Sequence, residues 1–205
     1  MRKIAFLFPG QGAQYIGMGK EIYDNFSSSK KIYEEASDTL GYDVAKMIFE
    51  GTEETLKITE NTQPCILTAS IACLMPILEE GINADILAGL SLGEYSALVA
   101  AKSLNFSEAV KLVRTRGYYM QNEVKLGEGT MAAILGLSDE DVISYCKEAA
   151  KVGIVEPANF NCPGQVVIAG EIKAVEHAME LCKLNGAKRA MLLPVSAPFH
   201  CSMLK

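Results

Sequence analysis

The chain has 205 residues, of which 49% are hydrophobic and 21% are charged, and its formal net charge is -6 at pH 7. This length and composition are typical of a globular protein with one core, or with one core and a small insert. The acidic balance disfavours non-specific binding to nucleic acid or to anionic membranes, because both attract basic surfaces.

The cysteine pattern and the apolar runs exclude further classes of protein. Six cysteines are scattered without a C-x-x-C pair or the spacing of a metal site, so we expect buried thiols in a reducing compartment. The apolar run at 4–8 is too short for a signal peptide, and the run at 65–78 is interrupted by Pro76 and is shorter than a membrane span. We therefore expect a cytoplasmic chain that binds no metal, no nucleic acid and no membrane.

Two stretches of the first half predict short buried strands, each followed by a glycine-rich turn. Residues 4–8 end at P-G-Q-G-A-Q, and residues 85–88 end at G-L-S-L-G. The first turn matches neither a dinucleotide fingerprint nor a P-loop, because Tyr15 and Gln14 stand where those motifs need glycine. Helices are predicted over 20–80, with the most apolar part at 62–78, and over segments that begin at Leu92 and after Asn105.

The second half has the order strand, helix, strand, strand, helix, strand, which is the ferredoxin-like arrangement. We expect an inserted small domain over 125–196, and a larger domain built from 1–124 and 197–205. The predicted strands of the insert are 130–135, 152–156, 166–169 and 190–195, and its predicted helices are 138–150 and 171–185.

Ser91 is the candidate nucleophile. It lies in a G-x-S-x-G pentapeptide after a predicted strand and before a predicted helix, which is the setting of a nucleophile elbow. The two flanking glycines would allow a strained turn, and the helix N-terminus would favour developing negative charge. An ordinary glycine-rich turn is the alternative.

A serine nucleophile needs a general base, and the chain offers two histidines. His177 falls beside Glu176 and Glu180 on the polar side of a predicted helix, which is typical of a surface histidine. His200 follows the last predicted strand of the insert, so elimination favours it as the base.

Five motifs in chain order carry a resemblance to a known family: P-G-Q-G-A-Q, G-L-S-L-G-E-Y-S-A-L, T-R-G-Y-Y-M-Q, N-F-N-C-P-G-Q and P-F-H. Together, over essentially the whole chain, they resemble the malonyl-CoA:acyl carrier protein transacylases. The resemblance implies an α/β-hydrolase-like large domain with an inserted ferredoxin-like small domain. It also implies malonyl transfer from malonyl-CoA to the phosphopantetheine thiol of acyl carrier protein, in fatty acid biosynthesis. No cofactor is implied, because both partners are substrates.

The resemblance assigns roles to residues around the nucleophile. Ser91 would carry the malonyl group, and His200 would take the serine proton and return it to the leaving thiol. Backbone N–H groups of Gln11 and Leu92 would form the oxyanion hole.

Further roles concern the substrate. Arg116 would grip the malonate carboxylate through a two-pronged ion pair, although sequence patterns alone do not separate it from Arg114. Phe199 would exclude an α-methyl branch, with a core phenylalanine as the alternative. In the matching loop, Asn159, Asn161 and Gln165 would touch the pantetheine arm or order the site. Candidate docking charges for an acidic carrier protein are Lys183, Lys188 and Arg189.

The sequence departs from the family pattern in two places. Leu90 stands where the family often has histidine, and the C-terminal third of the pattern, beyond P-F-H, is missing. That third would supply the rest of the large domain and the group that orients His200. We therefore expect the N-terminal two thirds of an acyltransferase. A serine esterase or thioesterase and an inactive fragment are the alternatives.

Overall fold

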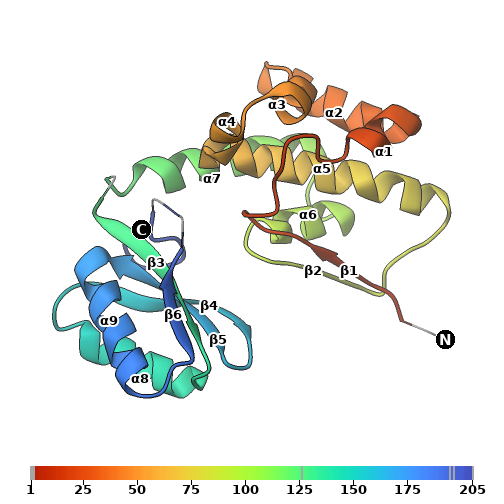
Figure 1. Cartoon of the computed structure of the whole chain (residues 1–205). Helices are drawn as coiled ribbons and strands as arrows, with labels where there is room; N and C mark the ends of the chain where they lie inside the picture. The colour runs from red at the N-terminus through yellow and green to blue at the C-terminus, as the bar shows by residue number, and fades with distance from the viewer. Residues whose placement is uncertain (1–2, 126, 194, 196, 205) are drawn as a thin grey trace. The chain divides into compact units, whose positions relative to one another are not determined.

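The computed structural model describes residues 3–125, 127–193, 195 and 197–204 (Figure 1). The chain divides into two compact units, Met1–Tyr119 and Met120–Lys205, called unit 1 and unit 2 below.

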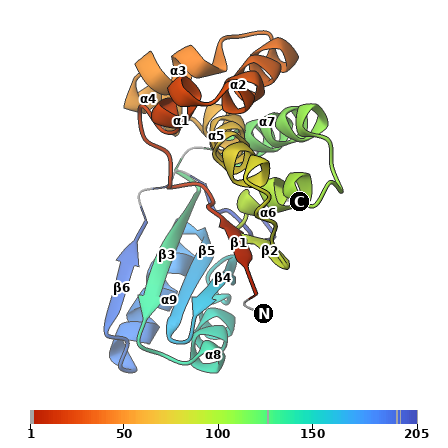
Figure 2. The ribbon, with the colours of Figure 1, turned by 90° about the vertical axis from the view of Figure 1, so that its right-hand side faces the viewer.

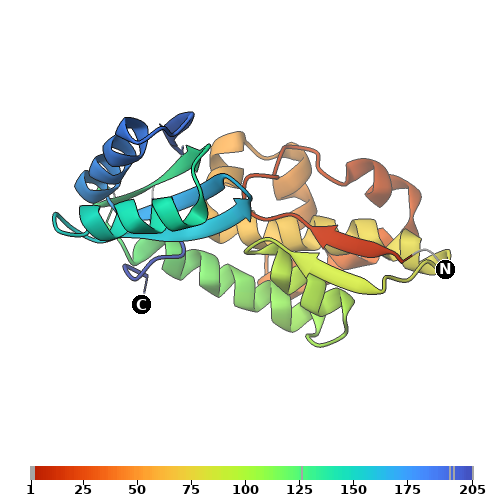
Figure 3. The same cartoon turned by 90° about the horizontal axis from the view of Figure 1, so that it is seen from below.

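Unit 1 is built around a parallel pair of strands, β1 (Ala5–Phe8) and β2 (Ile86–Gly89), which lie side by side in Figure 3. Parallel strands need a long connection, and here it is helical. Because the strands run in the same direction, the turns after β1 and β2 leave from the same edge of the sheet. The helices of the connection are α1 (Lys20–Asn25), α2 (Ser27–Leu40), α3 (Val44–Glu50), α4 (Glu53–Lys57) and α5 (Thr59–Glu79), and α6 (Gly93–Ala100) and α7 (Phe106–Asn122) follow β2.

Helix α5 is the core helix of unit 1, as its apolar sequence predicts. It lies between the α1–α4 group and the β1–β2 pair (Figures 1 and 2). Among the described residues it is the one helix long and apolar enough to cross a membrane, but 61% of its apolar window is buried inside the protein. Its polar side chains are satisfied internally: Thr62 Oγ1 donates to the Leu56 carbonyl at 2.6 Å, and Thr68 Oγ1 to the Pro64 carbonyl at 2.8 Å.

Pro76 lies inside α5, within the stretch over which the sequence predicts helix. A proline has no N–H, so the carbonyl of Ala72 loses its usual helical donor. The hydroxyl of Ser29, on α2, donates to that carbonyl at 2.8 Å in a buried position. The helix therefore continues to Glu79 because a neighbouring helix supplies the missing hydrogen bond.

Unit 2 confirms the predicted ferredoxin-like arrangement. Its sheet has the order β4-β5-β3-β6 with antiparallel neighbours, and Figure 2 shows α8 and α9 on one of its faces. Buried residues of β3, β5 and β4 alternate between the two faces, as a sheet with two covered faces requires. The elements are β3 (Gly129–Leu135), α8 (Asp139–Ala149), β4 (Val155–Cys162), β5 (Gln165–Glu171), α9 (Ile172–Leu184) and β6 (Arg189–Leu192).

The predicted strand 152–156 and the loop after it are wrong. The second strand of the insert is Val155–Cys162, so most of the expected loop forms a hairpin with β5. Pro157 is tolerated because β4 is an edge strand and the pairing is irregular between Pro157 and Asn159.

The segment 197–204 packs on the face of the sheet that the helices leave open. Ala197, Phe199 and Cys201 are buried there. Their partners on the sheet are Met131, Ala133, Val167 and Ala169. The division of the chain into 1–124 with 197–205, and 125–196, stays a prediction. Six residues of these predicted ranges lie outside the described residues: Met1, Arg2, Leu126, Pro194, Ser196 and Lys205.

Candidate active site

Ser91 occupies the turn between β2 and α6. Its φ is 51°, a left-handed conformation that a non-glycine residue keeps only where its surroundings enforce it. A Cβ on Gly89 would overlap the backbone of Gly93, and a Cβ on Gly93 would overlap the carbonyl oxygen of Phe8. Close backbone packing therefore requires both glycines, and it holds Ser91 half-buried at the start of α6.

The backbone amides of Gln11 and Leu92 lie in the two turns that follow β1 and β2. The two turns are in close contact. Gly10 lies so near the Leu90 carbonyl oxygen that a Cβ atom on Gly10 would be only 2.6 Å from it. Within the described part of the chain, neither amide donates a hydrogen bond. Two amides without acceptors beside a serine are what an oxyanion hole needs.

The side chain of Gln11 is tied to α5. Its Nε2 donates to Thr59 Oγ1 at 3.3 Å, while its Oε1 is buried and meets no donor among the described residues. This contact fixes the turn that carries the Gln11 amide. A buried carbonyl oxygen without a donor is also costly, so the site favours a ligand that can donate to it.

Arg116 projects from α7 toward Ser91. Its Nη2 donates to Ser91 Oγ at 3.2 Å, its Nη1 donates to Gln63 Oε1 at 2.8 Å, and its guanidinium carbon lies 5.6 Å from the centre of the Tyr95 ring. Burial lowers the pKa of Arg116, with Tyr95 and Glu94 opposing the shift, and the group stays charged. It forms no ion pair with any described residue. A desolvated charge without an ionic partner favours an anionic ligand beside Ser91.

Arg114 lies two residues earlier on α7 and has a structural role. Its Nη2 and Nε each lie 3.2 Å from Glu60 Oε1, and its guanidinium stacks on Tyr42 at 4.8 Å. The partners of the two arginines differ: Arg114 is neutralised by Glu60, whereas Arg116 meets no carboxylate among the described residues. This difference favours Arg116 as the candidate for binding an anionic ligand.

Gln63 is a site residue that the sequence analysis missed. Its side chain is fully buried in α5, and its Oε1 holds one nitrogen of Arg116. The sequence signal that could have pointed to Gln63 is its polar side chain in the most apolar helix, because a buried amide needs a hydrogen-bond partner. That signal does not say which residue the partner is.

His200 lies in unit 2, in the turn between the buried residues Phe199 and Cys201. It is exposed, and its φ of 62° is again left-handed. The side chain of Phe199 is buried on the sheet, which is the core role considered as the alternative for it. His177 is a surface residue, with 43% of its side chain exposed and Glu180 4.0 Å away.

The three polar residues of the N-F-N-C-P-G-Q motif lie on the β4–β5 hairpin and not in a loop. Asn159 and Asn161 belong to β4, and Gln165 begins β5 opposite Cys162, whose thiol donates to Gln165 Oε1 at 3.7 Å. Asn161 falls in an irregular step of the pairing, between Phe160 and Cys162. Irregular steps re-aim side chains, so this hairpin can present Asn161 away from the sheet.

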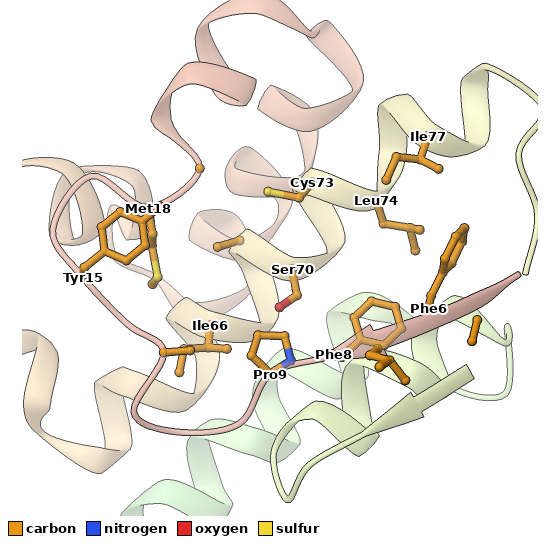
Figure 4. A pocket seen from close by; sticks show the side chains of 15 residues that line it. Phe6, Phe8, Pro9, Tyr15, Met18, Ile66, Ser70, Cys73, Leu74 and Ile77 are labelled. Atoms are coloured by element: carbon orange, nitrogen blue, oxygen red, sulfur yellow. The ribbon is translucent and has the colours of Figure 1, made fainter. Parts of the chain in front are cut away.

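An apolar pocket of about 410 Å³ lies between β1 and α5 in unit 1 (Figure 4). Phe6, Phe8, Leu74 and Ile77 point into it, and none of the predicted site residues lines it. The described residues also contain no cluster of three or more His, Cys, Asp or Glu side chains that could hold a metal ion.

Unit 1 thus has a serine at a strand-to-helix elbow with two available amides and a desolvated arginine, which defines a protein of the nucleophile-elbow class. The model of the acyl transferase domain family matches residues 5–204, and the chain belongs to this family.

This chain is similar over its whole length to curated relatives and to solved structures. The chain is 53% identical to the malonyl CoA-acyl carrier protein transacylase of Bacillus subtilis, covering 100% of this chain and 65% of that protein. The corresponding transacylase structure from Clostridium perfringens matches with a TM-score of 0.96 at 50% identity, over 99% of this chain and 64% of that one. A complex of a type II PKS acyl-carrier protein with its malonyl-transacylase matches with a TM-score of 0.95 at 47% identity, over 99% and 66%. These matches confirm the predicted fold class, and the chain spans about 65% of the length of these relatives.

Proposed function

We propose that this chain transfers a malonyl group from malonyl-CoA to the phosphopantetheine thiol of acyl carrier protein, through a malonyl-Ser91 intermediate. The observation that carries the proposal is the contact of Arg116 Nη2 with Ser91 Oγ at 3.2 Å, made by a guanidinium without an ion pair among the described residues. A simple esterase needs no such cation beside its nucleophile. Membership of the acyl transferase domain family supports the same reaction.

In the first half-reaction, Ser91 Oγ attacks the thioester carbonyl carbon and His200 accepts the hydroxyl proton. Negative charge develops on the carbonyl oxygen, where the amides of Gln11 and Leu92 donate to it and the N-terminus of α6 favours it. The carbon–sulfur bond then breaks. His200 returns the proton to the sulfur, coenzyme A leaves as its thiol, and the malonyl ester stays on Ser91.

Arg116 selects the acyl group. The free carboxylate of malonate accepts hydrogen bonds from the guanidinium, while Gln63 holds Nη1 and so fixes the plane of the group. Acetyl-CoA has no carboxylate and leaves the charge of Arg116 unpaired. The site therefore favours malonyl over acetyl groups.

In the second half-reaction, the carrier thiol gives its proton to His200 and its sulfur attacks the carbonyl carbon of the malonyl ester. The bond between that carbon and Ser91 Oγ then breaks, and His200 returns the proton to Oγ, which regenerates Ser91. The exposed residues Lys183, Lys188 and Arg189 are our candidates for docking an acidic carrier protein. The similar malonyl-transacylase that was solved with its acyl-carrier protein supports this kind of partner. We place the reaction in fatty acid biosynthesis in the cytoplasm, with no cofactor beyond the two substrates.

The remaining assignments rest on the motif resemblance. We propose that Phe199, besides packing on the sheet, excludes an α-methyl branch, so that methylmalonyl groups are disfavoured. Asn159, Asn161 and Gln165 contact the pantetheine arm through their amide groups.

The test follows the malonyl group with intact masses. The chain is mixed with malonyl-CoA and then with holo acyl carrier protein, and the masses of both proteins are recorded over time. We expect one malonyl group on the chain, followed by its appearance on the carrier. Free malonate without malonyl carrier would instead identify a hydrolase.

Two variants control the assignment of roles. Ser91→Ala removes the attacking oxygen, so neither protein gains mass, and His200→Ala slows the appearance of both adducts. The proposal is contradicted if the unchanged chain is folded by circular dichroism and yet gains no malonyl group.

A further inference from the structure

Glu156 of β4 binds the segment that carries His200 through both of its carboxylate oxygens. Its Oε2 accepts from the Ser202 backbone N–H at 2.8 Å, and its Oε1 accepts from the Ser202 hydroxyl at 2.7 Å. Both bonds are partly buried, which shields them from water. Hydrogen bonds to an ionised carboxylate are about twice as strong as neutral ones, so this pair forms a firm anchor.

Ser202, which Glu156 binds, lies two residues after His200, whose backbone conformation is strained. His200 has a φ of 62°, and such a conformation persists only where the flanking chain is held on both sides. On the N-terminal side, Phe199 is held by burial on the sheet. On the C-terminal side, Cys201 is buried and its thiol lies 3.1 Å from the Pro198 carbonyl, and Ser202 is bound by Glu156.

Glu156 is itself rigidly placed. It pairs with Ala169 of β5, and Ala169 belongs to the apolar cluster that covers Phe199 and Cys201. The carboxylate thus projects from the same sheet face on which the segment 197–204 packs. A site side chain is positioned best when the residues beside it are fixed to such a rigid element.

We infer that Glu156 is a positioning residue for His200: by binding Ser202 it holds the left-handed turn that presents the imidazole. This inference rests on the proposed function, in which His200 is the general base. Nothing in it requires Glu156 to touch the substrate.

The kinetic test compares Glu156→Gln and Glu156→Ala with the unchanged chain. Glutamine keeps one acceptor oxygen but loses the charge and the second acceptor, and alanine loses both. We expect the rate constant for malonyl-Ser91 formation to fall about 10-fold in the first and about 100-fold in the second, the size of effect that a small misplacement of a catalytic group produces. The ratio of malonyl to acetyl rates should stay unchanged, because Arg116, the proposed ligand of the malonyl carboxylate, is in unit 1 and Glu156 binds Ser202 instead.

Glu171→Gln is the matched control. Glu171 Oε1 also accepts from a backbone amide of unit 2, that of Ile154 at 3.1 Å, but no hydrogen bond joins it to the segment 197–204. A general loss of stability in unit 2 would slow this variant as much as Glu156→Gln. Positioning through Ser202 would leave it at the unchanged rate.

A second readout is independent of activity. The chain has only two histidines, so their imidazole Hε1 signals can be followed separately by NMR. In Glu156→Gln, the His200 signal should shift and broaden while the His177 signal stays in place. If the unchanged chain forms no malonyl-Ser91, the proposed function fails, but this spectrum still decides whether Glu156 positions His200.

The inference is overturned if Glu156→Gln keeps the unchanged rate and the unchanged His200 signal. It is also overturned if Glu171→Gln loses as much rate as Glu156→Gln.

Discussion

Arg116→Lys keeps the positive charge beside Ser91 but removes the fork that contacts two groups at once. Arg116 now donates to Gln63 Oε1 at 2.8 Å and to Ser91 Oγ at 3.2 Å. One ammonium group cannot hold Gln63 and also bind a carboxylate with two parallel hydrogen bonds. The variant therefore loses about one charge-assisted hydrogen bond to the malonyl carboxylate.

A charge-assisted hydrogen bond contributes about 1.5–3 kcal/mol, which corresponds to about 10- to 150-fold in rate. We expect kcat/KM for malonyl-CoA to fall by that factor, while the slow reaction with acetyl-CoA changes little. Acylation rates with each thioester, measured by intact mass after rapid quenching, give the ratio.

Arg114→Lys is the control on the same helix, because Arg114 is paired with Glu60 and does not contact Ser91. It should lower stability slightly and keep the ratio of malonyl to acetyl rates. The assignment is refuted if Arg116→Lys slows both thioesters equally, or if Arg114→Lys changes the ratio as much.

Three further predictions concern stability. Gly89→Ala should lower the free energy of unfolding by about 3 kcal/mol or more, because the new methyl overlaps backbone atoms. Gly81→Ala, where only a left-handed φ of 75° is strained, should cost about 1 kcal/mol, and equal urea midpoints would contradict this. Ser29→Ala removes the donor to Ala72 and should cost about 1–3 kcal/mol in thermal melts, whereas Ser28→Ala, whose buried hydroxyl meets no partner in the described chain, should cost nothing. The free energy of unfolding should also fall as the pH rises above about 9, because thiols of the unfolded chain lose their protons at a lower pH than the same thiols buried in the folded chain. A urea midpoint that is the same at about pH 8 and pH 10.5 would contradict this. The thiols concerned are those whose pKa burial raises to about 12, Cys65 and Cys146.

Much of the fold could be predicted from the sequence because its elements have clear periodicity. The apolar runs before P-G-Q-G and G-L-S-L-G are strands, and the strand and helix order of the insert gives the ferredoxin-like sheet. The predicted helical stretch continues through Pro76, where Ser29 satisfies the exposed carbonyl. The error in the insert occurs where tertiary partners decide the local structure: β4 continues past Pro157 because it is an edge strand with an irregular register.

In the candidate site, too, the features set by local sequence could be predicted, and those set by distant partners could not. The G-x-S-x-G spacing predicts an elbow at Ser91, and the glycine contacts give the physical reason for that spacing. The partners of Arg114 and Arg116 come from helices far away in the sequence, so no local pattern could separate the two residues. The same is true of Gln63, and of Glu156, whose partner Ser202 is 46 residues away.

Malonyl transfer through Ser91 is tested most directly by locating the acyl group after the chain has been mixed with equal amounts of malonyl-CoA and acetyl-CoA. The quenched protein is digested, and the modified peptide is sequenced by tandem mass spectrometry. We expect one modified residue, Ser91, carrying malonyl in large excess over acetyl, and a loss of that excess in Arg116→Ala. Malonyl on another residue, or equal amounts of the two acyl groups on Ser91, would contradict it.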